Sequence, residues 1–397
     1  MKYKFARQGE IQLTFTSQKI KNIPPYIFSE INKKKAELTQ KGIDVIDLGI
    51  GDPDLPTPQP IVDKLVKEMK NQQNFKYSTY SGCAEFREAV SSFYQKQYGV
   101  QLDPKTEVLT LIGSKEGIAN LVPTVVNPGN YVLVPDPSYG VYRMAAHLAD
   151  SKSYSMPITE ENDYKPDLEQ LPDNIKKQAE LMFLNYPSNP TAAMADLSFF
   201  QQAIAFGKKH KIPIAHDFAY NMISFNNPAP SILQVEGSKD ITVEFGSLSK
   251  SYNMTGWRIG YIVGNKNIIH SLSVIKSNTD TSQFLPIQKA GAYALEMDQS
   301  ILDKNVGIYQ KRMKTFVQGL HSLGINVKPP GGSFFVWFPV PEDYTSGTFA
   351  NEVLEKCGVV ITPGSAFGPY GEGYARVSLT HSVERLEEAV QRLAKVL

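Results

Sequence analysis

The chain has 397 residues, of which 42% are hydrophobic and 20% are charged, and its formal net charge is +1. This length exceeds the size at which one hydrophobic core stops growing, so two domains are expected. The nearly neutral charge gives no reason to expect nucleic acid or an anionic membrane as a partner. Two cysteines, Cys83 and Cys357, cannot build a disulfide framework, and no run of 18 apolar residues occurs. A cytoplasmic protein is therefore predicted.

Helix-like and strand-like segments alternate through the first two thirds of the chain. Residues 60–71 and 84–98 are predicted to be helices, because apolar side chains recur there at helical spacing. Six short apolar runs are then predicted to be buried strands: 107–112, 131–134, 179–184, 212–215, 241–245 and 259–263. Such runs, separated by segments of helix length, are typical of a mostly parallel, seven-stranded type of α/β sheet flanked by helices.

The alternation becomes looser after about residue 280, which predicts a smaller α+β domain. A helical tract over 285–323 is followed by a strand-like run at 331–338, a helix at 348–357 and a C-terminal helix from residue 383. Residues 16–48 precede the first α/β unit and are expected to pack with this part. The predicted organisation is an N-terminal arm (1–15), a large domain (49–285) and a small domain (16–48 with 286–397).

Lys250 lies among small hydroxyl residues directly after a predicted strand. Small neighbours allow a bulky partner to approach the amine, and Ser247, Ser249 and Arg258 are placed to bind an anion beside it. This arrangement suits a lysine that forms a Schiff base with a phosphorylated aldehyde, pyridoxal phosphate. A Ser-x-x-Lys motif alone is more typical of an ordinary loop lysine, so the hypothesis depends on the remaining motifs.

A phosphate site is predicted where residues 113–117, Gly-Ser-Lys-Glu-Gly, follow a strand and open a helix. Backbone N–H groups at a helix N-terminus favour an anion, and Ser114 and Lys115 lie at this point. Ser247 and Arg258 would supply further contacts, since a guanidinium can bind two oxygens together. The alternative is a simple turn with a helix cap.

Three further residues are candidates for holding a pyridine ring. Asp217 follows a predicted strand and should lie at the carboxyl edge of the sheet, where its carboxylate would favour a protonated ring nitrogen. Tyr220 and the amide of Asn189 would bind the phenolic oxygen of the ring, and Tyr139 would stack on its face. The alternatives are a helix-capping aspartate, an Asn-Pro turn and a core tyrosine.

Taken together and in this order, these motifs resemble the class I/II aminotransferases, the aspartate aminotransferase-like, fold-type I family of pyridoxal-phosphate enzymes. The resemblance runs from about residue 22 to the C-terminus. Its most specific parts are Asn-x-Pro-x-Asn-Pro at 185–190, Asp-x-x-Tyr at 217–220, and Ser-x-Ser-Lys at 247–250 with Arg258. The resemblance implies the fold of that family, with a large cofactor-binding domain and a smaller one.

The resemblance also implies a role for each matching residue. Lys250 would hold the cofactor and move the proton, Asp217 would pair with the ring nitrogen, and Tyr220 and Asn189 would bind the ring oxygen. The phosphate would be bound by Ser114, Lys115, Ser247 and Arg258.

Three roles come from the resemblance alone. Tyr77 would reach the phosphate of a neighbouring subunit, which implies a homodimer with shared active sites. Arg376 would bind the α-carboxylate of the substrate, with Asn189 and the backbone of Gly51 beside it.

Within the family, the runs at 23–30, 113–117 and 332–338 look most like those of LL-diaminopimelate aminotransferases. Aspartate, alanine and aromatic aminotransferases share much of these runs. No arginine can be placed for a distal carboxylate, which disfavours an aspartate-specific enzyme. The expected activity is transamination between an amino acid and a 2-oxo acid, with 2-oxoglutarate as acceptor.

The sequence supports alternatives to transamination to different degrees. A β-eliminating carbon–sulfur lyase would use the same cofactor residues, so it stays an alternative. An acyl-enzyme with Ser247 as nucleophile normally carries Ser-Asp-Asn and Lys-Thr-Gly elements, and the sequence contains neither. A transcriptional regulator would need more room before the first α/β unit. The six histidines lack ligand spacing, so no metal site is predicted.

Overall fold

The computed structural model describes residues 4–5, 11–12, 15–21, 23 and 27–397. Its central element is a seven-stranded sheet of order β4-β10-β9-β8-β7-β5-β6. The strands are β4 (Val108–Leu111), β5 (Tyr131–Asp136), β6 (Lys152–Pro157), β7 (Ala179–Asn185), β8 (Ile214–Asp217), β9 (Thr242–Ser247) and β10 (Gly260–Gly264). β10 runs antiparallel to both of its neighbours, whereas the other neighbouring strands are parallel. The predicted α/β fold with a mostly parallel sheet is confirmed.

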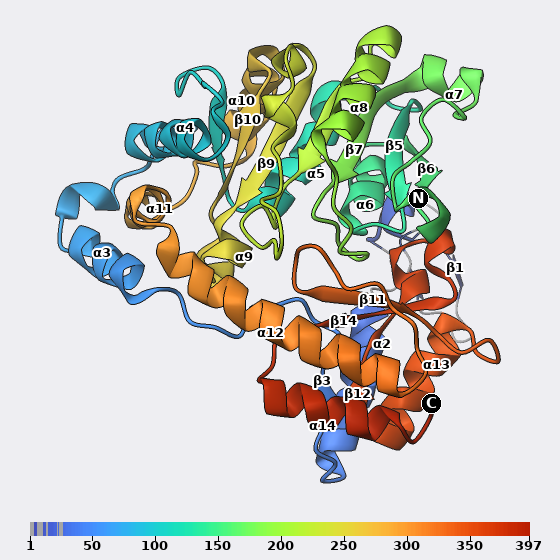
Figure 1. Cartoon of the computed structure of the whole chain (residues 1–397). Helices are drawn as coiled ribbons and strands as arrows, with labels where there is room; N and C mark the ends of the chain where they lie inside the picture. Colours follow the sequence, from blue (N-terminus) through green and yellow to red (C-terminus); the bar gives the residue numbers. More distant parts are fainter. Residues whose placement is uncertain (1–3, 6–10, 13–14, 22, 24–26) are drawn as a thin grey trace.

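Helices surround this sheet, as Figure 1 shows. They are α3 (Gln59–Met69), α4 (Ala84–Tyr98), α5 (Ser114–Val125), α6 (Val141–Leu148), α7 (Asp173–Gln178), α8 (Leu197–His210), α9 (Leu248–Ser251), α10 (Lys266–Thr279) and α11 (Leu285–Glu296). Side chains of β7 alternate between two cores, with Met182 and Leu184 in one and Leu181 and Phe183 in the other. This alternation explains why the central strands are apolar throughout.

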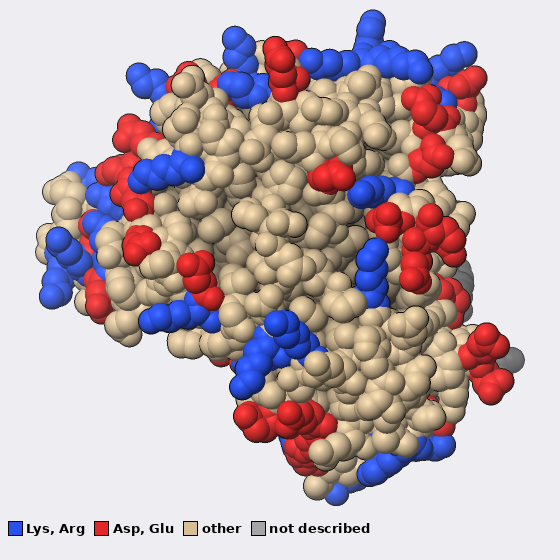
Figure 2. Space-filling view, in the orientation of Figure 1, with Lys and Arg blue, Asp and Glu red and all other residues tan. Residues whose placement is uncertain are grey.

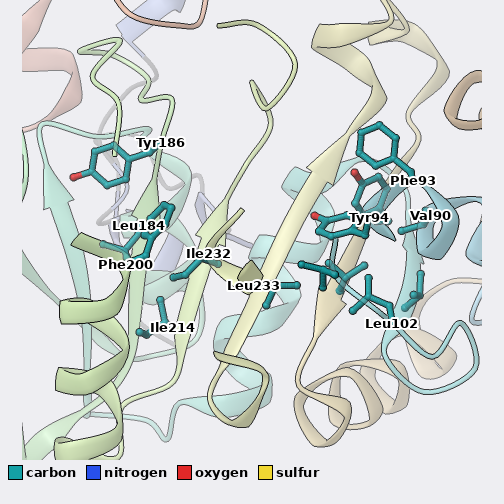
Figure 3. Packing of buried hydrophobic residues seen from close by; sticks show 14 of the residues in the cluster. Val90, Phe93, Tyr94, Leu102, Leu184, Tyr186, Phe200, Ile214, Ile232 and Leu233 are labelled. Atoms are coloured by element: carbon teal, nitrogen blue, oxygen red, sulfur yellow. The ribbon is translucent and has the colours of Figure 1, made fainter. Parts of the chain in front are cut away.

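One of these cores contains many aromatic side chains. In Figure 3, Phe93 and Tyr94 of α4 lie on one side of the view, and Tyr186 and Phe200 lie on the other. Ile232 and Leu233 lie between the two groups and belong to the same cluster. Burying these large side chains provides much of the driving force that holds the helices on the sheet.

A smaller group of elements lies in the lower part of Figure 1, around the carboxyl half of the long helix α12 (Ser300–Ser322). It comprises α2 (Ile27–Gln40), β3 (Ile46–Asp47), α12 (Ser300–Ser322), β11 (Phe335–Pro339), α13 (Ser346–Glu352), β12 (Val359–Val360), β13 (Thr362–Pro363), β14 (Tyr374–Ser378) and α14 (Val383–Leu393). β11, β14 and β13 form an antiparallel sheet, and β3 pairs with β12. The exact domain boundaries stay a prediction, and much of the predicted arm at 1–15 lies outside the described residues.

Several predicted elements differ from the structure; the strand-like run at 331–338, for example, is strand only from Phe335 to Pro339. The helical tract at 285–323 is two helices, because the side chain of Gln299 donates to the carbonyl oxygens of Ala294, Leu295 and Met297 and ends α11 there. Asp298 then accepts from the backbone N–H of Ser300 at 3.0 Å, where α12 begins. The strand predicted at 212–215 begins two residues later and extends to Asp217.

The surface carries charges of both signs. On the face shown in Figure 2, lysines, arginines and acidic residues lie mainly along the edges, and uncharged residues dominate the centre. In the part of the chain that the structure describes, no helix is both long enough and apolar enough to span a membrane.

Candidate active site

Three strand ends bring the predicted phosphate-binding residues to one edge of the sheet. Leu111 at the end of β4, Gly260 at the start of β10 and Ser247 at the end of β9 are register partners across the sheet. The hydroxyl of Ser247 accepts from a backbone N–H two residues on, at 3.2 Å, and caps the short helix α9. This helix carries Lys250, so the cap fixes the lysine relative to the sheet edge.

Arg258 lies against the turn that opens α5. The φ of Gly113, +76°, favours glycine, and a Cβ atom added there would lie 2.4 Å from a guanidinium nitrogen of Arg258. Ser114 is the first residue of α5, directly after that turn. The ammonium of Lys115 lies 6.0 Å from the ring centroid of Tyr139. The structure therefore places these five residues around one helix N-terminus, which favours an anion.

Lys250 is largely enclosed by the fold. Its Nζ donates to the carbonyl oxygen of Gly51 at 2.6 Å and lies 5.7 Å from the ring centroid of Phe334. Burial lowers the pKa of Lys250 to about 8; the nearby Asp52 carboxylate opposes this effect, and two arginines of the site add to it. Near neutral pH this amine is therefore uncharged far more often than an exposed lysine.

Asp217 ends β8 and is buried. Tyr142 of α6 donates its hydroxyl to Oδ2 of Asp217 at 2.7 Å, and the Asn185 amide donates to the backbone oxygen of Asp217 at 2.7 Å. Oδ1 of Asp217 has no hydrogen-bond partner among the described residues. Burial raises the pKa of Asp217, and the Tyr142 hydroxyl partly offsets this. A buried, unpartnered carboxylate oxygen is what a protonated ring nitrogen would bind.

Arg376 lies on β14 and reaches toward the same site. Its guanidinium donates to Oδ1 of Asn189 at 2.7 Å and to the carbonyl oxygen of Gly49 at 2.6 Å. The guanidinium carbon lies 4.2 Å from the ring centroid of Phe335 and 4.7 Å from that of Phe367. The two rings and the two bonds fix the orientation of this guanidinium fork.

Tyr220 packs against the two phenylalanines that contact the lysine and the arginine. Its ring centroid is 5.5 Å from that of Phe334, which also contacts Lys250, and 5.6 Å from that of Phe335, which contacts Arg376. Burial raises the pKa of Tyr220, so its hydroxyl keeps its proton and can donate a hydrogen bond.

Gly51 and Tyr77 occupy contrasting positions. A Cβ atom added to Gly51 would lie 2.6 Å from the ring of Phe335, so the backbone there packs too closely for a side chain. Tyr77, in contrast, is 89% exposed. Within one chain, the predicted site residues other than Tyr77 gather at the sheet edge and the facing β14.

The sequence did not predict the roles of Tyr142, Asn185, Phe334 and Phe335. Tyr142 follows Tyr139 by three residues, and Asn185 precedes Asn189 by four. Polar residues at one-turn spacing or at the end of a buried strand were the available signals. Their partners became visible only once β5, β7 and β8 were adjacent in the sheet.

Known proteins resemble this chain over nearly its whole length. Residues 43–393 match the family model described as aminotransferase class I and II. A relative named LL-diaminopimelate aminotransferase from Moorella thermoacetica is 49% identical over 96% of this chain and 98% of its own. One of the same name from Aquifex aeolicus is 46% identical over 95% of this chain and 98% of its own.

Solved structures of aminotransferases and of BacF are also similar to this chain over nearly its whole length. Substrate-bound BacF from Bacillus subtilis is 37% identical, with a TM-score of 0.93 and coverage of 97% of this chain and 98% of that one. A mutant aspartate aminotransferase from Thermus thermophilus is 26% identical, with a TM-score of 0.91, and covers 97% of this chain and 100% of its own.

The fold and the family match define the class of protein: the chain belongs to the class I and II aminotransferases. It is a pyridoxal-phosphate-dependent transferase of amino-acid metabolism, and its substrates are an amino acid and an oxo acid. The predicted resemblance and enzyme class are confirmed.

Proposed function

We propose that this enzyme transfers an amino group from LL-diaminopimelate to a 2-oxo acid, with 2-oxoglutarate as the acceptor. The support is the name carried by relatives that are 46% and 49% identical over nearly the full chain. The runs at 113–117 and 332–338, which pointed to the same subfamily, lie at the site. Part of the third run, residues 24–26, lies outside the described residues.

The observation that carries the proposal is that one site contains both a buried lysine, Lys250, and a buried carboxylate oxygen without a hydrogen-bond partner, Oδ1 of Asp217. The Oδ1 atom of Asp217 fits the ring nitrogen of pyridoxal phosphate, and the turn at Ser114 with Ser247 and Arg258 fits its phosphate. Pyridoxal phosphate, when bound, supplies an aldehyde that accepts the amino group and a ring that accepts electrons. Tyr220 and the amide of Asn189 would donate to the ring oxygen, and Tyr139 would pack on the ring.

The chain's own residues then perform the binding and the proton transfer. Arg376 binds the substrate α-carboxylate, because its guanidinium is already oriented by Asn189 and the Gly49 carbonyl. Lys250, in its neutral form, would take the proton from the substrate α-carbon and hold it on Nζ for delivery to the carbon that was the cofactor's aldehyde carbon. Its lowered pKa, about 8, supports this role as a base at physiological pH. In the structure, the amine of Lys250 donates to the carbonyl oxygen of Gly51.

Tyr77 supports a dimeric enzyme. Its side chain is 89% exposed, so it is accessible to a second copy of the chain. We propose that Tyr77 reaches the cofactor phosphate of a second copy, so the enzyme is a homodimer with shared sites. A cytoplasmic location and the division into a large (49–285) and a small (16–48, 286–397) domain stay predictions.

The test is an assay of purified enzyme with a panel of amino donors and 2-oxoglutarate, in which the formation of glutamate is measured. LL-Diaminopimelate should give the highest kcat/KM, above aspartate, alanine and aromatic amino acids. Lys250→Ala should abolish glutamate formation with every donor. A higher kcat/KM for another donor would overturn the substrate proposal. Release of pyruvate and ammonia from cystathionine without an acceptor would instead indicate a carbon–sulfur lyase.

A further inference from the structure

Gln283 joins two parts of the phosphate site that lie on different strands. Its side-chain amide donates to the carbonyl oxygen of Leu111, at the end of β4, at 2.6 Å. The same amide donates to the carbonyl oxygen of Arg258 at 3.0 Å. Leu111 leads into the turn at Gly113, and Arg258 supplies the guanidinium beside that turn. One buried side chain therefore bonds both backbone segments that form the phosphate site, at Leu111 and at Arg258.

Arg258 needs such a restraint because its backbone is in the left-handed region, at φ +53°. This conformation is unfavourable for a side chain with a Cβ and persists only where surrounding contacts hold it. The hydrogen bond from Gln283 to its carbonyl oxygen is one of these contacts. Without it, the backbone of Arg258 has less to keep its guanidinium against Gly113.

The amide of Gln283 can adopt only one orientation. Its nitrogen faces two carbonyl oxygens, which accept hydrogen bonds, and its oxygen accepts from the hydroxyl of Ser282 at 2.8 Å. A flipped amide would place its oxygen against both carbonyls, so the hydrogen-bond partners determine the assignment. The residue is 9% exposed, and water is a poor substitute donor there.

The segment that carries Gln283 is itself fixed on both sides. The carboxylate of Asp280 accepts from the backbone N–H of Ser282 at 2.8 Å and pairs with the fully buried Lys276 at 2.9 Å. Lys276 also pairs with Glu116 at 3.1 Å, and Glu116 accepts from the backbone N–H of Ile112 at 3.0 Å. This chain of ion pairs therefore links the segment of Gln283 to α5, which follows the Gly113 turn.

A second buried glutamine holds the backbone of the first. The amide nitrogen of Gln288 donates to the backbone oxygen of Gln283 at 2.6 Å, and its oxygen accepts from the backbone N–H of Cys83 at 2.7 Å. Gln288 is fully buried on α11. The position of Gln283 is therefore set by the fold and does not depend on a bound ligand.

We propose that Gln283 is a positioning residue for the phosphate of the cofactor, acting through Arg258 and the Gly113 turn. The inference rests on the proposed cofactor site. Its consequence is selective: losing the Gln283 amide should weaken phosphate contacts and leave contacts to the pyridine ring unchanged, because Asp217 and Asn185 lie on other strands and Tyr142 lies on α6.

The experiment compares two ligands that differ only in the phosphate. Full-length apoenzyme is titrated with pyridoxal phosphate and with pyridoxal, for the wild type and for Gln283→Met, which keeps the side-chain length and removes the donor. We expect the dissociation constant for pyridoxal phosphate to rise about tenfold or more, as for the loss of about 1.4 kcal/mol. The constant for pyridoxal should stay within about twofold, well below that tenfold step.

Two further variants complete the test. Gln299→Met is the matched control, because the Gln299 amide bonds the carbonyl oxygens of Ala294, Leu295 and Met297 and the hydroxyl of Tyr252, none of which belongs to the phosphate site. It should change neither constant. Ser282→Ala removes only the hydroxyl that orients the amide, so it remains informative if Gln283→Met does not fold; a smaller loss, again for pyridoxal phosphate alone, is expected.

The outcomes separate the inference from the proposal beneath it. Equal weakening of both ligands, or no weakening of either, in Gln283→Met and Ser282→Ala would overturn the role of Gln283. If wild-type enzyme itself binds pyridoxal as tightly as pyridoxal phosphate, the proposed phosphate site fails, whatever the variants do.

Discussion

Burial acts on Lys250 and Asp217 in the same physical way and with opposite consequences for their pKa values. In both residues it disfavours the charged form, so the pKa of Lys250 falls to about 8 and that of Asp217 rises. The lower pKa makes Lys250 more reactive at neutral pH, since the neutral amine is the reactive form. The aspartate needs a positively charged partner at Oδ1, and a protonated ring nitrogen would supply it.

The lowered pKa of Lys250 predicts how the apoenzyme reacts with an aldehyde as the pH changes. The neutral amine predominates above the folded-state pKa, so the rate of labelling by pyridoxal should rise with pH through a midpoint near 8. An ordinary lysine, with a pKa near 10.5, would give a midpoint near that pH. Labelling is measured by borohydride reduction and mass spectrometry at each pH, with Lys250→Arg as background. A midpoint above 10 would contradict the environment described for this amine.

Single residues could be predicted only where a local pattern carries the chemistry. Lys250, Asp217 and Asn189 each follow a predicted strand, so the sequence placed them at one edge before the fold was known. Tyr142 could not be predicted as the partner of Asp217, because the two residues lie 75 positions apart and meet only across the sheet. Their roles toward the cofactor stay predictions until tested.

At the scale of elements, a buried polar bridge joins the strands that carry the site. On β8, His216 lies 2.8 Å from Glu244 of β9 and 3.1 Å from the carbonyl oxygen of Tyr186, which follows β7. Glu244 also accepts from the hydroxyls of Tyr94 and Ser231, each at 2.7 Å. The three strands ending at Asn185, Asp217 and Ser247 are therefore tied together beneath the site.

This bridge predicts a measurable contribution to stability. Glu244→Gln replaces an acceptor of several hydrogen bonds by an amide that cannot satisfy all of them, and hydrogen bonds to a charged group contribute about 2 kcal/mol each. The free energy of unfolding of the apoenzyme in urea should fall by at least about 2 kcal/mol. Glu169→Gln, an exposed carboxylate on the surface, is the control and should change it by less than about 0.5 kcal/mol. Equal stability of both variants would show that the bridge is not structural.

Elements were predictable where their apolar pattern is strong. The six predicted strands correspond to β4, β5, β7, β8, β9 and β10. β6 was missed, because it lies at the edge of the sheet and its residues are mostly polar and partly exposed. The break between α11 and α12 was missed for a different reason: it depends on the Gln299 side chain, whereas the apolar spacing continues across it.

At the scale of the whole molecule, the exposure of Tyr77 predicts that two subunits share each site. Lys250→Ala and Tyr77→Ala chains are co-expressed so that mixed dimers form. Each mixed dimer contains one site with both defects and one intact site. Random pairing makes half of the dimers mixed, so the activity should reach about a quarter of the wild-type value. Activity no higher than the mean of the two separate variants would contradict a shared site.

The general architecture followed from the sequence, whereas its assembly did not. Apolar runs separated by helices predict a parallel sheet, and ligands of such sheets gather at the carboxyl edge of the strands. The antiparallel β10 was not predicted, although it places Gly260 between Leu111 and Ser247. Strand order and direction depend on contacts between distant segments, which no local pattern encodes.

The most direct test of the account is to identify the amino group that holds the cofactor. Holoenzyme purified with pyridoxal phosphate is reduced with borohydride, digested, and mapped by mass spectrometry. One pyridoxyl-phosphate label per chain is expected, on Lys250. A label on any other lysine, or a chain that stays unlabelled after saturation with the cofactor, would contradict it.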